Sequence, residues 1–138
     1  MTCIAYRNGV MAGETLSAFD NVKNLHFRKI AKRRGYLLGM CGEDIPALED
    51  AVQWFFDGGT GSLEPHKFDM LAVTPEGVIQ LWDHRGCMDV LQKPYFAIGS
   101  GHTYALGCMF NGGDAITAVR AAMEFSPSCG GRIIVRRL

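Results

Sequence analysis

The sequence predicts an α+β domain in which two β-sheets are stacked and helices cover both outer faces, a four-layer α/β/β/α sandwich. Short apolar segments of strand length occur in two groups, one at the start and one in the middle of the chain. A helical segment separates the groups, and two further helical segments precede a final strand. Because strands and helices do not alternate one by one, this order argues against a parallel sheet of β-α-β units.

Length and composition are typical of one globular domain. The 138 residues suffice for one sizeable core and are too few for two comfortable ones, so residues 1–138 are expected to form a single domain. Fourteen basic and fourteen acidic residues cancel, so the charge indicates neither nucleic acid nor a membrane as partner. No apolar run reaches the ~20 residues that a membrane-spanning helix needs.

The chain is expected to begin, without a leader, inside a β-hairpin. Apolar residues flank Asn8-Gly9 on both sides, and this dipeptide is the strongest short-range signal of a two-residue hairpin turn. The polar segment 16–23 predicts a turn. Alternating polarity over 25–30 predicts the next strand, and the apolar run 36–41 predicts a buried strand after it.

A helix is predicted next. Asp44 followed by Pro46 is a helix-start signal, because the carboxylate can cap the first turn and proline fits into it. Apolar residues at helical spacing continue as far as Phe56. Gly58-Gly59 is expected to end the helix.

The second half of the chain predicts strands and two more helices. Segments 68–74 and 78–82 are expected to pair as a hairpin, and 95–98 to form a further strand. The segment 104–110 is apolar nearly all round and predicts a buried helix. A last helix capped by Asp114 and a C-terminal strand over residues 132–138 follow.

The five cysteines indicate neither a disulfide framework nor a zinc site. Their number is odd and no Cys-x-x-Cys pair occurs. His84 and Cys87 could begin a metal site, but no second pair of ligands accompanies them. We therefore expect no metal and no cofactor, and a reducing, cytoplasmic setting.

Thr2 is the candidate nucleophile. Removal of Met1 would leave a threonine with a free α-amine on a rigid strand. Such an amine can act as the general base for the hydroxyl of its own residue, and its ordinary pKa of about 7.7–8.0 suits that task near neutral pH. Taken alone, a threonine at this position is in most proteins an ordinary strand residue.

Several motifs together resemble the proteasome β-subunit family. They are Met-Thr-x-Ile-Ala-Tyr-Arg-Asn-Gly-Val-Met-Ala at the start, the strand over 68–73, Ala-Ile-Gly-Ser-Gly-His-Thr-Tyr-Ala-Leu-Gly over 97–107 and Cys-Gly-Gly over 129–131. This family belongs to the N-terminal-nucleophile (Ntn) hydrolases, and the bacterial HslV peptidase is its compact member. The resemblance covers nearly the whole chain, which is shorter than a typical member. It implies the same four-layer sandwich.

The resemblance also implies a catalytic group around Thr2. Lys29 matches the family's active-site lysine on the third strand, where an ammonium would favour a neutral α-amine and stabilise a developing alkoxide. Glu14 falls where the family has an aspartate paired with that lysine. Gly42 matches the backbone N–H donor of the oxyanion hole, and Ser100 matches a serine that helps to position the nucleophile.

Four further residues complete the implied site. Met40 and Phe27 match walls of the pocket for the substrate side chain. Ser126 departs from the family, which usually has an aspartate there to orient the N-terminal threonine and its amine, and Cys129 stands where many members have serine. Loss of a carboxylate that orients a base typically costs about an order of magnitude or more in rate. This departure bears on the activity and not on the fold.

Two function classes remain open. The first is a threonine peptidase that cuts amide bonds of peptides or unfolded proteins through an acyl-enzyme on Thr2, inside a homo-oligomeric ring that an ATP-dependent unfoldase could serve. The second is a catalytically inactive assembly component, for example a virion-associated one, because small proteasome-like chains also occur in phage genomes. A phosphate-binding loop over 99–101 is disfavoured, since the dinucleotide fingerprint and the P-loop lysine are missing.

Three consecutive aromatic residues predict a subunit contact. Adjacent helix residues point about 100° apart, so Trp54, Phe55 and Phe56 are not all expected to face the core of their own chain. The family resemblance implies closed homomeric rings. We therefore expect stacked rings in which part of this aromatic cluster lies at a subunit contact.

Overall fold

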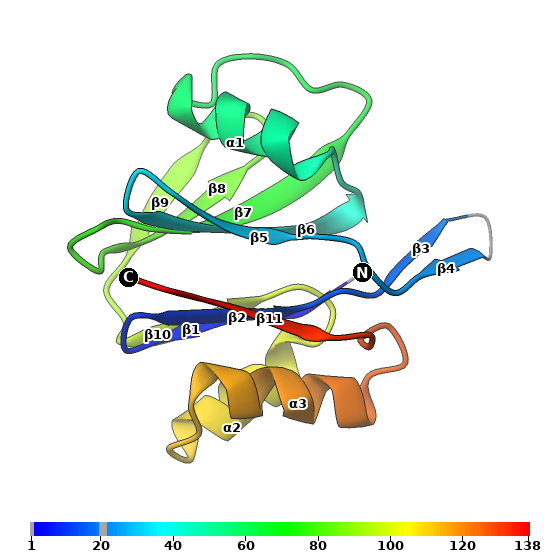
Figure 1. The fold of residues 1–138 in the computed structure, drawn as a ribbon. Helices are drawn as coiled ribbons and strands as arrows, with labels where there is room; N and C mark the ends of the chain where they lie inside the picture. The colour runs from blue at the N-terminus through cyan, green and yellow to red at the C-terminus, as the bar shows by residue number, and fades with distance from the viewer. Residues whose placement is uncertain (1, 20–21) are drawn as a thin grey trace.

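The computed structural model describes residues 2–19 and 22–138 and has four layers in the order helix, sheet, sheet, helix (Figure 1). Helix α1 (Leu48–Phe56) covers the outer face of one sheet. Helices α2 (His102–Phe110) and α3 (Ala115–Phe125) cover the outer face of the other. This arrangement confirms the predicted α/β/β/α sandwich.

The sheet under α2 and α3 is antiparallel and has the order β10-β1-β2-β11. Its strands are β1 (Ile4–Arg7), β2 (Val10–Glu14), β10 (Tyr95–Ile98) and β11 (Ile133–Arg137). The predicted N-terminal hairpin is confirmed. Asn8 and Gly9 have φ angles of 50° and 77°, the left-handed conformation that this kind of two-residue turn needs. The start of the chain therefore lies in the interior of a sheet.

The sheet under α1 is also antiparallel and has the order β5-β6-β7-β8-β9. Its strands are β5 (Ile30–Arg33), β6 (Tyr36–Asp44), β7 (Lys67–Val73), β8 (Ile79–Asp83) and β9 (Met88–Leu91). The predicted hairpin of the middle segment is β7 and β8. Strand β9 was not predicted, because three of its four residues are exposed and no apolar alternation marks it.

Two predictions between the first strands are wrong. The segment expected to be a turn contains β3 (Ser17–Phe19) and β4 (Val22–Asn24), which extend from one end of the sandwich (Figure 1). The strand expected over 25–30 is irregular up to Lys29, and β5 begins at Ile30. At the end of this segment the side chains still point alternately, since Lys29 points into the protein while its neighbour Arg28 is exposed.

The predicted helix start is also wrong. Strand β6 continues through Gly42 to Asp44, with a register shift after Cys41. The Asp44 carboxylate therefore does not cap α1 and lies 2.8 Å from Nδ1 of His66. The helix begins only at Leu48, and its N-cap residue is Ala47, whose side chain cannot accept a hydrogen bond.

The aromatic residues of α1 pack within their own chain, contrary to the expectation. Trp54 and Phe55 are buried against the sheet. Phe56 is half-buried, with its ring 5.7 Å from the ring of Tyr36 and 4.5 Å from the guanidinium carbon of Arg34. The turn between β5 and β6 thus reaches the side of the helix, and the argument for a subunit contact here no longer holds.

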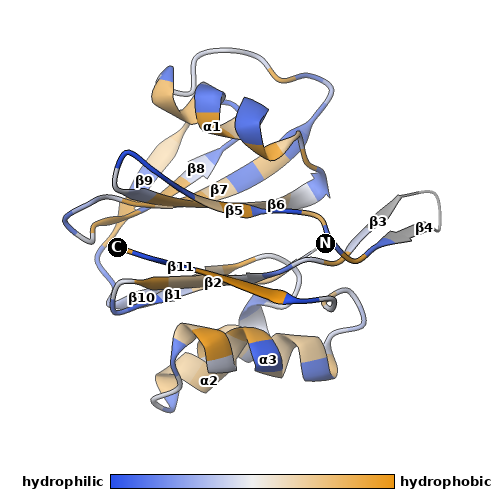
Figure 2. Cartoon of the chain, in the orientation of Figure 1, coloured by the Kyte–Doolittle hydropathy of each residue, from blue (hydrophilic) through white to orange (hydrophobic). Residues whose placement is uncertain are grey.

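The prediction that helix α2 is buried all round is wrong. Only Ala105 and Met109 are buried, whereas Phe110 is 79% exposed. The ring of Tyr104 stacks on that of Phe125 from α3 at 5.8 Å, and both are exposed. Figure 2 shows hydrophobic residues on these two helices as well as along the strands of both sheets. In the described part of the chain, no helix has the length and apolar character needed to cross a membrane.

Candidate active site

The N-terminal hairpin brings Thr2 and Glu14 together. Thr2 lies just before β1, and Glu14 is the last residue of β2. Because Ile4 pairs with Gly13 in the hairpin register, the start of β1 lies beside the end of β2. Lys29 reaches the same point from the segment before β5, in the facing sheet. All three residues are at most 3% exposed.

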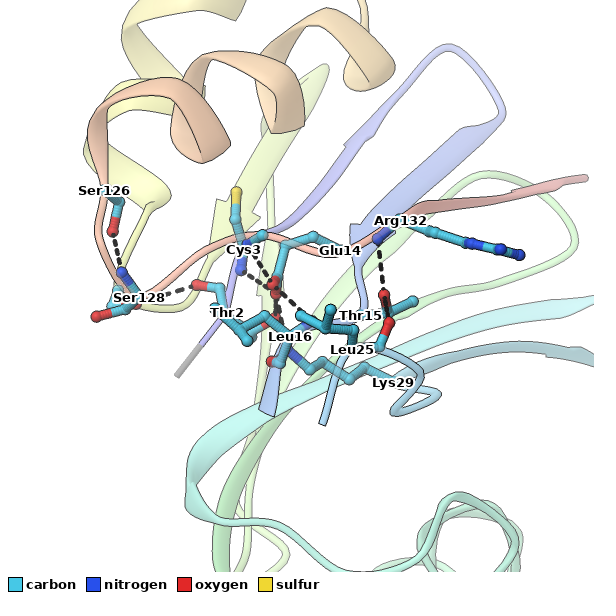
Figure 3. A network of polar contacts seen from close by, with 12 residues as sticks. Thr2, Cys3, Glu14, Thr15, Leu16, Leu25, Lys29, Ser126, Ser128 and Arg132 are labelled. Atoms are coloured by element: carbon cyan, nitrogen blue, oxygen red, sulfur yellow. Dashed lines mark hydrogen bonds and ion pairs between the residues drawn. The ribbon is translucent and has the colours of Figure 1, made fainter. Parts of the chain in front are cut away.

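The three side chains point toward one another (Figure 3). The Lys29 ammonium donates to Thr2 Oγ1 at 2.7 Å and to Glu14 Oε1 at 2.7 Å. The Thr2 hydroxyl donates to the same carboxylate oxygen. The nucleophile candidate is therefore in direct contact with a buried cation and a buried anion.

Glu14 is held by main-chain donors from three segments. Its Oε1 accepts from the amide of Cys3 at 3.2 Å. Its Oε2 accepts from the amides of Leu16 at 3.1 Å and Gly130 at 3.0 Å. Buried carboxylates are costly unless they are paired and hydrogen-bonded, and this one is both.

Burial also acts on the lysine. It lowers the pKa of Lys29, and the neighbouring Glu14 carboxylate opposes that effect. The ammonium further donates to the carbonyl of Leu16. Neutralising either charged group would remove the opposite charge that pairs with the other in the protein interior.

The Gly-Ser-Gly segment packs on the main chain of Thr2. The Thr2 carbonyl accepts from the amide of Gly101 at 3.1 Å and from the Ser100 hydroxyl at 3.4 Å. Gly99 has a φ of +99°, and a Cβ there would lie 2.1 Å from the Thr2 carbonyl oxygen. The segment therefore has no room for a side chain at this glycine and serves to hold the nucleophile candidate.

Ser126 and Cys129 lie together with Ser100. Burial raises the pKa of the Cys129 thiol, while hydrogen bonds from the Ser126 and Ser100 hydroxyls oppose this shift. The Cys129 amide donates to the Ser126 carbonyl at 3.2 Å. The three groups are uncharged near neutral pH, so the position where the family carries an aspartate contributes no negative charge. Their roles stay predictions.

A cavity of about 420 Å³ opens beside Thr2. Gly42 and Ser100 line it, together with Thr2 itself. Met40 and Phe27 do not line it. Met40 is fully buried in the apolar cluster beneath α1, and Phe27 packs against that cluster.

Two acidic residues and a histidine in the cavity lining were not predicted from the sequence. Glu43, Asp69 and His102 face the same cavity as Thr2. Asp69 comes there because it pairs with Cys41 in the register of β6 and β7. No local pattern marks such a residue, since its position depends on how two distant strands align.

Known proteins match this chain in structure and not in sequence. No family model matches the sequence, and no curated protein matches it. The structure of Thiobacillus denitrificans BPH in complex with epoxomicin matches with a TM-score of 0.68 and 19% identity, over 99% of this chain and 98% of that one. Eukaryotic HslV from Trypanosoma brucei matches with a TM-score of 0.70 and 14% identity, over 98% and 97%.

The chain has the proteasome β-subunit and HslV fold. At these identities the similarity establishes the sandwich and its topology, as the motifs had predicted. The chemistry must be argued from the residues of this chain. Among the described residues, no group of three His, Cys, Asp or Glu side chains is arranged to hold a metal ion.

Proposed function

We propose that this chain is a threonine peptidase of the Ntn-hydrolase class. The observation that carries the proposal is the contact of Thr2 Oγ1 with the Lys29 ammonium at 2.7 Å, inside a buried ion pair with Glu14. A buried cation beside a hydroxyl stabilises the alkoxide that develops when the hydroxyl attacks a carbonyl. The shared HslV fold supports the same class.

The proposed reaction has two halves. Met1 lies outside the described residues, and its removal would free the α-amine of Thr2. In the first half the amine takes the hydroxyl proton while Oγ1 attacks the carbonyl carbon of the substrate. The backbone N–H of Gly42 stabilises the oxyanion. The ammonium formed returns its proton to the leaving amine, and an ester on Thr2 remains.

Water completes the second half. The same α-amine takes a proton from a water molecule, which attacks the ester carbonyl. The ammonium formed returns its proton to Thr2 Oγ1 as the second tetrahedral intermediate collapses, which releases the carboxylic acid product and restores the Thr2 hydroxyl. Lys29 stays protonated throughout, and Glu14 fixes its position by the ion pair.

The proposal also covers the substrates, the assembly and the cellular location of the enzyme. Peptides or unfolded proteins are its substrates, a closed homo-oligomeric ring encloses its sites, and an ATP-dependent unfoldase serves it in the cytoplasm. All five cysteines are free, which agrees with a reducing compartment. The exposed apolar side chains of Phe110 and Phe125 support an assembly, because soluble proteins usually cover such groups.

A second candidate is an inactive assembly component of the same fold. The observation that favours it is the uncharged group of Ser126, Cys129 and Ser100, in which no carboxylate stands where the family has one to orient the amine. In that case the ring would form and the sites would not react.

An inhibitor experiment separates the two candidates. Intact mass first establishes whether Met1 is absent, and the protein is then incubated with a peptide epoxyketone and mapped. We expect one adduct on Thr2, lost in Thr2→Ala and retained in the control Thr103→Ala on the exposed side of α2. An adduct on Cys3, or none on protein that lacks Met1, would contradict the peptidase and favour the assembly component.

A further inference from the structure

The cavity beside Thr2 has an acidic side and an apolar side. Glu43 and Asp69 contribute the carboxylates, and Leu81, Phe96 and Ile98 contribute most of the apolar wall. No lysine or arginine is among its lining residues. The cavity is thus a negatively charged recess with an apolar wall, placed at the candidate nucleophile.

The strand register explains why Asp69 faces this recess. Residues 69, 71 and 73 alternate along β7 with residues that face α1, so they share one face of the strand. Leu71 and Val73 belong to the core between the two sheets. Asp69 therefore points to the same space, at the end where Thr2 lies.

The salt bridges of the described residues do not include either carboxylate. Asp83 pairs with Asp69 in the register of β7 and β8, but its carboxylate is bound by the Arg85 guanidinium at 2.7 Å. Within the described part of the chain, neither Glu43 nor Asp69 forms an ion pair.

Electrostatics favour a cation at this place. Burial raises the pKa of the Asp69 carboxyl, the Asp83 charge adds to the shift, and His84 opposes it. A positive group bound in the recess would relieve this repulsion, while an acidic group would increase it.

We propose that the recess selects a lysine or arginine side chain of the bound peptide, with Glu43 and Asp69 binding the charged end and the apolar wall contacting the methylene stem. Long basic side chains combine such a stem with such an end, and the volume falls within the range of ligand pockets. The inference rests on the proposed peptidase function and names its substrate class.

Cleavage of a peptide library tests the selection. The residues on either side of the cleaved bond are varied, and products are identified by mass spectrometry. At one position we expect kcat/KM for lysine to exceed that for norleucine, which keeps the four-carbon stem and lacks the ammonium, by about tenfold. In Asp69→Asn this ratio should fall several-fold. The matched control Asp50→Asn, at an exposed position of α1, should keep it. Equal rates for both peptides would overturn the selection and leave the peptidase standing.

Binding tests the recess without catalysis. Calorimetry on Thr2→Ala compares the lysine peptide with its norleucine counterpart at low and high salt. We expect tighter binding of the lysine peptide, with a difference that shrinks as salt rises. Such binding without any cleavage by the unaltered protein would overturn the peptidase and support the recess. Equal binding would overturn the recess.

Discussion

Two groups of charges lie near Thr2, and they differ in burial and in pairing. Lys29 and Glu14 contact its hydroxyl and form a buried ion pair. Glu43 and Asp69 line the open cavity that Thr2 also lines, without an ion pair in the described chain. The first group can act on the nucleophile itself, and the second can act only on what enters the cavity. In the proposed peptidase, Lys29 and Glu14 act on the reaction, whereas Glu43 and Asp69 act on the choice of substrate.

The largest expected effect is on the rate. Lys29→Ala should lower kcat/KM for peptide hydrolysis by about three orders of magnitude, because the developing alkoxide loses its cation. The control Lys32→Ala removes an exposed lysine of β5 and should keep the rate. Steady-state kinetics, with circular dichroism to verify folding, makes the measurement. A Lys29→Ala protein with unchanged turnover would remove Lys29 from the mechanism.

The next effect is on stability. Glu14→Gln should lower the free energy of unfolding by about 3–5 kcal/mol, because it removes the carboxylate that pairs with the buried Lys29 ammonium. Glu49→Gln is the matched control, since Glu49 forms an exposed ion pair with Arg33 and its loss should cost a small fraction of that value. Urea denaturation measures both.

A double variant tests whether the buried ion pair of Glu14 and Lys29 serves the reaction as well as the fold. Glu14→Gln combined with Lys29→Met removes both buried charges at once and should recover part of the stability lost in Glu14→Gln. It should not recover hydrolysis. Recovery of hydrolysis in the double variant would mean that the ion pair serves only the fold.

The smallest effect concerns pH. Because burial lowers the pKa of Lys29, its ammonium should lose its proton at a lower pH than a free lysine, and kcat/KM should fall as pH rises through that value. Stability should change in the opposite direction. Between the lowered folded pKa and the ordinary unfolded one, the unfolded chain holds the proton and the native chain does not, so this group's contribution to stability rises with pH. A pH–rate profile beside denaturation curves over the same range tests both signs.

The sequence predicted the layers and the hairpin at Thr2, because Asn8-Gly9 fixes a turn and hence a register locally. The convergence of Glu14 and Lys29 on Thr2 came from the family resemblance. No local pattern predicts these contacts, because Glu14 and Lys29 are distant from Thr2 along the chain. Asp69 could not be found, since its place depends on the alignment of β6 with β7.

The errors share a physical cause. Asp44 and Pro46 form a helix-start signal that has no effect here. Strand β6 continues past Gly42 and pairs with β7 up to Asp44. Exposed strands such as β9, a short strand with three exposed residues, lack the sustained alternation of apolar and polar residues that marks a half-buried strand. Likewise an apolar helix such as α2 need not be buried in its own chain, since composition does not tell which surface will cover it.

The hydrogen bond between Glu14 and Gly130 spans 116 positions of the chain and has a consequence for the order of folding. Contacts between residues so distant in sequence form late, because a long loop must close first. During synthesis, Gly130 leaves the ribosome only after almost all of the sandwich has been made. A partly folded or nascent chain therefore has Thr2, Glu14 and Lys29 but lacks the hydrogen bond from the Gly130 amide to the Glu14 carboxylate. In the proposed peptidase, the full set of hydrogen bonds around this carboxylate forms only after the segment before β11 has docked.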